Sequence, residues 1–169
     1  FMLDFQAARY LMDGDVAKQA GNNHPTSIPT GVFETSNGYM NIAVVGEQIW
    51  QRFAKAFDRP DWLNNEDYNT GAGRSQNRGA LNDEINAITR TDSTENWVAK
   101  LNEAGVPCGE INDIGQAFDS PQVKHLGMAM PVNSNERGQT ELVGQPIMMS
   151  RTPSAITAPP PLAGGHCDD

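Results

Sequence analysis

The pair Asn37-Gly38 constrains the fold of this chain more than any other feature of the sequence. It separates two runs rich in β-branched, aromatic and other apolar residues, at positions 32–35 and 39–45. An Asn-Gly pair readily adopts the positive φ angles of the tight turn that joins two antiparallel strands, so it is a strong short-range signal for a β hairpin. The sequence therefore predicts a hairpin over residues 32–45.

Three amphipathic patterns after the hairpin predict helices. In residues 47–57, four apolar side chains recur at spacings that place them on one helical face: Ile49, Trp50, Phe53 and Phe57. Residues 75–89 predict a second helix with three aliphatic residues on its inner face: Leu81, Ile85 and Ile88. The third helix is predicted to begin with a capping box at Asp92 and Glu95 and to end at Gly105.

The remaining pattern completes a mixed unit of helices and strands. Two short helices are predicted between residue 113 and Gly127, the second opened by Ser120 as N-cap and Pro121 at the first helical position. Two short strands are predicted to follow, at residues 130–133 and 140–143. The predicted fold class of residues 30–144 is therefore α+β.

Both ends of the sequence are interpreted as connections to another body. Residues 1–10 have a roughly helical apolar spacing but no capping signal before them, so we expect the end of a helix already under way. Glycine, proline and small polar residues make residues 13–30 a linker. The proline-rich segment after Ser150 is expected to be extended.

The charge of the chain excludes some functions. Its formal net charge is −9, and such a surface repels phosphate backbones, so we expect no nucleic-acid partner. The same charge argues against this chain being the main dock for a polyphosphorylated cofactor. No apolar run reaches the roughly 18 residues that span a bilayer, so no membrane association is expected. The two cysteines, Cys108 and Cys167, lie far apart, which is typical of reduced thiols in a cytoplasmic protein.

Several segments, taken in order and with their spacing, resemble class III coenzyme A transferases. This group holds formyl-CoA transferases, carnitine CoA-transferases and α-methylacyl-CoA racemases. The segments that carry the resemblance are the hairpin at 31–45, the residues Arg74, Asn77 and Arg78, the stretch 97–128, the string 143–153, the prolines 159–161 and the pair Gly165-His166.

The resemblance implies a domain organisation. In the family, a small α+β domain is inserted into a Rossmann-like large domain built from both chain ends, and two subunits interlock. Residues 1–29 then correspond to a large-domain helix end and linker, 30–144 to the small domain, and 145–169 to a proline-rich return towards the large domain. A homodimer and a missing N-terminal large domain are the implied partners.

The resemblance also implies a chemistry. Family members transfer CoA between an acyl-CoA and a carboxylic acid through an aspartate nucleophile. That aspartate lies upstream of the region that matches Phe1, so we assign no catalytic residue here and expect a truncated member that is not active alone. Asp4, Asp13 and Asp15 are interpreted as surface carboxylates. One alternative is a free-standing, non-catalytic small domain that dimerises. A further alternative is a fragment from the racemase branch, which moves a proton beside the thioester carbonyl.

One element of the family's active site corresponds to residues 21–30. Formyl-CoA transferases have there a glycine-rich loop that closes over the thioester. This chain has no glycine run at that place, which argues against a formyl or oxalyl substrate. Asn22, Asn23 and His24 are the candidate residues for binding acyl-CoA, the substrate that the family implies. The alternative for His24 is a solvated linker histidine.

Other reactive side chains receive structural interpretations. Glu47 lies near the place of a catalytic carboxylate in racemase relatives, but it also suits the first turn of a helix. Cys108 has no sequence neighbour that would lower the pKa of its thiol. His125 and His166 lack partners at metal-ligand spacing, so no metal site is predicted. Arg151 is interpreted as a surface ion-pair residue rather than a phosphate or carboxylate contact.

Overall fold

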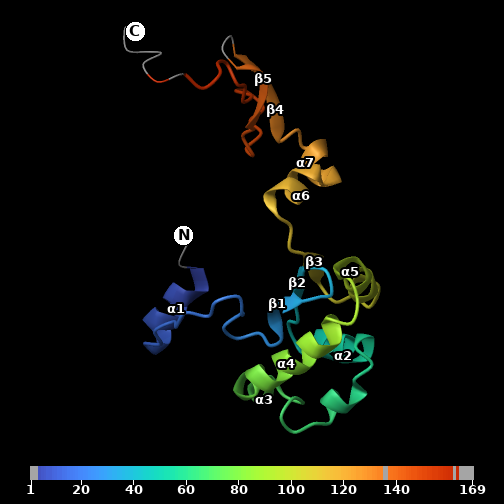
Figure 1. Ribbon diagram of the computed structural model, residues 1–169. Helices are drawn as coiled ribbons and strands as arrows, with labels where there is room; N and C mark the ends of the chain where they lie inside the picture. Colours follow the sequence, from blue (N-terminus) through green and yellow to red (C-terminus); the bar gives the residue numbers. More distant parts are fainter. Residues whose placement is uncertain (1–3, 135–136, 162, 164–169) are drawn as a thin grey trace. The chain divides into compact units, whose positions relative to one another are not determined.

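The computed structural model of the chain describes residues 4–134, 137–161 and 163. It divides into two compact units, residues 1–111 and 112–169. Both units contain helices and strands (Figure 1), which confirms the α+β class. The boundaries predicted after residues 29 and 144 refer to the domains of a complete family member and stay predictions.

The first unit is built on a three-stranded antiparallel sheet with the order β1-β2-β3. Its strands are β1 (Thr30–Glu34), β2 (Tyr39–Ala43) and β3 (Cys108–Glu110). The predicted hairpin is confirmed: β1 and β2 pair with Phe33 opposite Met40. Its turn differs from the expected Asn-Gly type, because neither Asn37 nor Gly38 has a positive φ and the Asn37 side chain instead accepts from the Thr94 N–H at 2.8 Å. Phe33 and Met40 are both buried, because cross-strand partners face the same side of a sheet. One face of the sheet therefore packs against the hydrophobic core.

Helices cover this buried face and enclose an aromatic cluster. They are α2 (Glu47–Ala56), the 3-10 helix η1 (Pro60–Leu63), α3 (Gly71–Gln76), α4 (Arg78–Thr89) and α5 (Thr94–Glu103). Helix α4 contacts β1, and α5 contacts β2 and β3. The cluster consists of five aromatic rings, whose neighbouring centroids lie 4.3–6.0 Å apart: Trp50, Phe53, Phe57, Trp62 and Trp97. All five are buried, so their hydrophobic burial and ring contacts stabilise this unit.

The single helix predicted at residues 75–89 is wrong, because the structure has two helices that meet at Asn77. Helix α3 begins earlier, where the Thr70 hydroxyl accepts a hydrogen bond of 3.0 Å from the Gly73 N–H. Asn77 leaves the helical conformation, with φ −102° and ψ 22°, and its side-chain amide donates back to the Gly73 carbonyl. The glycines of α3 conceal this helix in the sequence, since glycine is a poor helix former.

The capping box predicted at Asp92 and Glu95 is also wrong, by one residue. Ser93 is the N-cap of α5, and its hydroxyl accepts from the Asn96 N–H. Asp92 accepts instead from the Ser93 N–H, and Glu95 accepts from the Asn37 side chain. The end of α5 is as predicted, with Gly105 at φ 69° directly after the C-cap.

The first unit begins with helix α1 (Asp4–Asp13), which is exposed along most of its length. The second unit contains α6 (Ile114–Asp119), α7 (Pro121–His125) and the hairpin of β4 (Ala129–Ser134) with β5 (Gly138–Val143). The predicted Ser120 cap and Pro121 start of α7 are confirmed. In the part of the chain that the structure describes, no helix is long and apolar enough to cross a membrane.

Candidate functional site

The loop that precedes β1 contains all three candidate residues. Asn23 forms an isolated β-bridge with Gly31, and the His24 N–H donates to the Thr30 carbonyl at 2.8 Å. The chain therefore folds back on itself over these residues. The return is so close that a Cβ at Gly31 would lie 2.8 Å from the carbonyl oxygen of Asn22. Only glycine fits this position without a shift of the backbone.

Two arginines from α3 and α4 fix the loop by its carbonyl oxygens. Arg74 donates from Nε to the Ile28 carbonyl at 3.0 Å. Arg78 donates from Nη1 to the His24 carbonyl at 2.8 Å and from Nη2 to the Pro25 carbonyl at 3.3 Å. Charge-assisted hydrogen bonds of this kind are stronger than neutral ones. The loop is thus held from outside at three carbonyl groups.

Arg74 is the more deeply buried of the two arginines, with 4% of its side chain exposed. Besides the Ile28 carbonyl, it binds the Tyr68 carbonyl at 2.9 Å and the Glu47 carboxylate at 2.6 Å. Its guanidinium also lies 4.7 Å from the centre of the Trp50 ring. A buried charge needs such partners, and Arg74 links the loop, α2 and α3 through them.

The ring of His24 has a defined orientation. Its Nδ1 accepts hydrogen bonds from the backbone N–H groups of Thr26 at 3.2 Å and Ser27 at 2.9 Å. The ring also stacks on Phe5, with 6.1 Å between centroids and 19° between planes. In neutral histidine, a nitrogen that accepts leaves the proton on the other nitrogen. His24 therefore presents Nε2–H as a donor.

The structure places the other candidate residues of the loop in different roles. The side-chain oxygen of Asn23 accepts from the Asn82 amide of α4 at 3.2 Å, so Asn23 ties the loop to the helix. Asn22 is exposed and contributes its backbone to the close approach with Gly31. The three residues are neighbours in the loop, and the Nε2–H of His24 takes no part in the loop's own hydrogen bonds, which use Nδ1.

Glu47 serves the fold. It lies in the first turn of α2, and its carboxylate pairs with Arg74. This ion pair gives the Glu47 carboxylate a structural partner, in line with the interpretation of Glu47 as a first-turn helix residue.

The structure also describes two other residues considered in the sequence, Cys108 and Arg151. The Cys108 thiol faces the Val98 carbonyl at 3.6 Å, and burial raises its pKa, so its thiolate is disfavoured. No described residue forms an ion pair with Arg151, contrary to the surface ion pair expected from the sequence.

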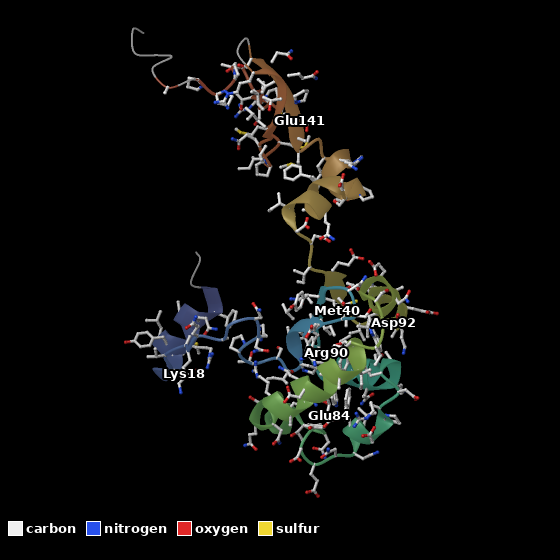
Figure 2. All side chains as sticks on the ribbon, viewed as in Figure 1. Lys18, Met40, Glu84, Arg90, Asp92 and Glu141 are labelled. Carbon is white, nitrogen blue, oxygen red and sulfur yellow. The ribbon has the colours of Figure 1, made fainter. Side chains whose placement is uncertain are left out.

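A polar cluster around Glu84 of α4 was not anticipated from the sequence (Figure 2 labels this residue). Glu84 accepts from Arg59 at 2.8 Å, from the Trp62 indole at 2.9 Å and from the Tyr68 hydroxyl at 2.8 Å. Burial alone would raise the pKa of Glu84, but the three hydrogen bonds outweigh it and lower this pKa. Burial, followed by the bond to Glu84, raises the pKa of Tyr68 to about 12.

The cluster joins η1 to α4 and has all its acceptor atoms occupied by protein donors, so we assign it a structural role. In the described residues, no group of three or more His, Cys, Asp or Glu side chains is arranged to hold a metal ion.

Comparison with known proteins identifies the family of the chain. The sequence model of CoA-transferase family III matches residues 1–167. Human succinyl-CoA:glutarate CoA-transferase is 30% identical over 160 residues, which cover 95% of this chain and 36% of that protein. The succinyl-CoA:mesaconate CoA-transferase of Haloarcula hispanica is 30% identical over 159 residues, covering 94% of this chain and 39% of that protein.

A solved structure agrees. The crystal structure of a CAIB/BAIF family protein from Brucella suis matches with a TM-score of 0.81 and 27% identity. The match covers 97% of this chain and 42% of that one. The chain thus spans less than half the length of the relatives that it matches.

Proposed function

The chain belongs to CoA-transferase family III, and on that premise we propose that it forms part of an enzyme that moves coenzyme A from an acyl-CoA to a carboxylic acid. The loop from Asn22 to His24 would lie against the thioester of the acyl-CoA. The nucleophile would come from a segment other than these 169 residues. The large domain of the family would complete the site.

The orientation of His24 is the observation that carries this proposal. When a nucleophile attacks a thioester, negative charge develops on the carbonyl oxygen, and a fixed N–H donor at that oxygen lowers the barrier. The His24 ring is held by two backbone N–H groups at Nδ1, which leaves Nε2–H available for such an oxygen. The arginine contacts at the carbonyls of His24 and Pro25 fix the backbone that carries the ring.

We further propose that the acid substrate is a small dicarboxylic acid. The two curated relatives described above are named for glutarate and mesaconate, and both are dicarboxylic acids. The loop also lacks the glycine run expected of formyl-CoA transferases, which favours a different acyl group.

Thermal unfolding with and without succinyl-CoA tests the proposal. A ligand at 100 times its dissociation constant stabilises the folded state by about 2.7 kcal/mol, which gives a clear rise in melting temperature. The informative variant is His24→Asn, because the asparagine oxygen can accept the Thr26 N–H as in an Asx turn, whereas asparagine carries no group at the place of Nε2. We expect the variant to melt as the parent does without ligand and to lose most of the rise with succinyl-CoA.

Two results would contradict the proposal. If the melting temperature did not rise with succinyl-CoA up to millimolar concentrations, this chain would not contain an acyl-CoA site. If the melting temperature of the parent and of His24→Asn rose equally with succinyl-CoA, His24 would not belong to that site.

The second candidate function is a non-catalytic module that dimerises, and exposed apolar side chains on and after α1 favour it. Leu11 and Met12 are 80% and 82% exposed, and Val16 is 69% exposed. Phe5 is 44% exposed, whereas Phe1, Met2 and Leu3 lie outside the described residues. Neighbouring apolar groups at such exposure are typical of an interaction surface. Sedimentation equilibrium distinguishes this candidate: it predicts a dimer that succinyl-CoA does not stabilise.

A further inference from the structure

A small concave site beside the candidate loop carries an excess of positive charge. Its volume is about 320 Å³, and its lining includes Arg9 of α1, Asp15 and Lys18 of the following segment, Pro25 of the loop and Arg78 of α4. The three cations exceed the one carboxylate by two charges, in a chain whose formal net charge is −9. The local field therefore has the opposite sign to that of the whole chain.

The guanidinium of Arg78 is positioned before any ligand arrives. Its bonds to the carbonyls of His24 and Pro25 occupy two of the five N–H donors that a guanidinium carries. The ordering of this long side chain is thus already achieved by the fold, so a ligand does not have to supply it. Arg78 therefore lines the pocket and also holds the backbone of the loop that carries His24.

The other charged residues of the pocket differ in availability. Arg9 is paired with Asp15 and also binds the side-chain oxygen of Gln6 at 3.2 Å. Lys18 is exposed on the segment after α1, where Figure 2 labels it. A ligand anion would meet Lys18 and Arg78 directly, and it would compete with Asp15 for Arg9.

We propose that this pocket binds an anionic oxygen group of a substrate, and that the group is the distal carboxylate of the dicarboxylic acid. The proposal rests on the function proposed above, because it assigns one end of that acid to the pocket and leaves the other end for the thioester chemistry near His24. The volume is at the lower limit of ligand pockets and suits a short diacid rather than a whole nucleotide. Arginine also matches carboxylate geometry through paired N–H donors.

The shared chemistry of carboxylates and phosphates gives the pocket two conceivable sources of anion, the acid substrate and the nucleotide of CoA. Titrations with glutarate and with adenosine 3′,5′-bisphosphate separate them. The readout is the NMR signals of the Nε–H groups of Arg9 and Arg78 in the intact chain. We expect saturable shifts with glutarate, much weaker ones with butyrate, which lacks the second carboxylate, and none with the bisphosphate.

Variants of opposite sign make the test specific. Lys18→Gln should weaken glutarate binding by about fivefold, and Asp15→Asn should strengthen it by a similar factor, as expected for single charges at a partly exposed site. Two controls make the same charge changes elsewhere on exposed helix positions: Lys55→Gln on α2 and Glu103→Gln on α5. Neither control should change the affinity by more than about 1.5-fold at 0.15 M salt, where screening is strong.

The outcomes separate this inference from the proposed function. Saturation by the bisphosphate but not by glutarate would overturn the assignment to the acid and give the pocket to the CoA nucleotide. If neither anion gave a saturable shift, or if the variants and their controls changed the glutarate affinity equally, the pocket would not be an anion-binding site. Stabilisation by succinyl-CoA would survive both results, because it reports on the thioester end at His24.

Discussion

Replacing Arg74 with methionine should destabilise the first unit more than any other single arginine substitution in it. Methionine fills a similar volume but removes three donor contacts, to Ile28, Tyr68 and Glu47. The carbonyls of Ile28 and Tyr68 then lose their arginine donor, and a hydrogen bond from a charged donor contributes about 1.5–3 kcal/mol.

The magnitude follows from those contacts and one offset. The Glu47 carboxylate is 56% exposed, so water replaces its lost partner at little cost. Loss of the contact with the Trp50 ring adds about 1 kcal/mol. Methionine, however, avoids the cost of burying a charge, which offsets part of the loss. The net destabilisation is about 3 kcal/mol, a large share of the roughly 5–15 kcal/mol that holds a typical domain folded.

Tryptophan fluorescence during urea unfolding measures this change cleanly. All three tryptophans of the chain, Trp50, Trp62 and Trp97, lie in the first unit, so the signal reports on that unit alone. With a slope of about 2 kcal/mol per molar, a loss of 3 kcal/mol lowers the urea midpoint by about 1.5 M.

Arg90→Met is the matched control for Arg74→Met. Arg90 pairs with Glu34, and both side chains are about half exposed, so this change should cost less than about 1 kcal/mol. If the midpoint of Arg74→Met fell no further than that of Arg90→Met, the role assigned to Arg74 in holding the loop would be refuted.

Three further results are expected. Because the folded-state pKa of Glu84 is lowered, its contribution to stability is present above the ordinary glutamate pKa of about 4.3 and is lost as the pH falls through the folded value. Urea midpoints should therefore fall more steeply on acidification in the parent than in Glu84→Gln. Parallel profiles of midpoint against pH would contradict this expectation. Ser93→Ala should cost about 1 kcal/mol by removing the cap of α5, whereas Asp92→Ala should cost less, and the reverse order in urea unfolding would restore the cap predicted from the sequence. In a Cys167→Ser background, the partly buried Cys108 thiol should react with a disulfide reagent at pH 8 more slowly in the folded chain than in urea, and equal rates would argue against its raised pKa.

The parts of the fold that the sequence predicted well depend on local chemistry. The pairing of β1 with β2 and the start of α7 at Ser120-Pro121 each follow from residues a few positions apart. The failures arose where tertiary contacts decide. The break between α3 and α4 accompanies the buried Arg74, whose partner at Ile28 lies 46 positions away in the sequence.

The candidate site was reached from the sequence only through family resemblance. That resemblance pointed to Asn22, Asn23 and His24 as candidates, but no sequence pattern predicted the orientation of the His24 ring. Arg74 and Arg78 matched the family pattern without a role, because their carbonyl partners belong to a linker that has no periodicity of its own. For Arg78, its place three residues before Leu81 on the inner face of the predicted helix could have suggested such a role. Arg74 precedes that predicted helix, so no comparable signal pointed to it.

Photolabelling tests the central claim, that the loop from Asn22 to His24 contacts the acyl group of an acyl-CoA. The probe is a short acyl-CoA with a diazirine in its acyl chain, and mass spectrometry locates the label after trypsin digestion. Cleavage after Lys18 and Arg52 releases the loop in one peptide, since no lysine or arginine lies between them. The account predicts label at residues 22–24 of this peptide, reduced by excess succinyl-CoA and by His24→Asn. Label confined to other peptides, or label that succinyl-CoA does not reduce, would contradict it.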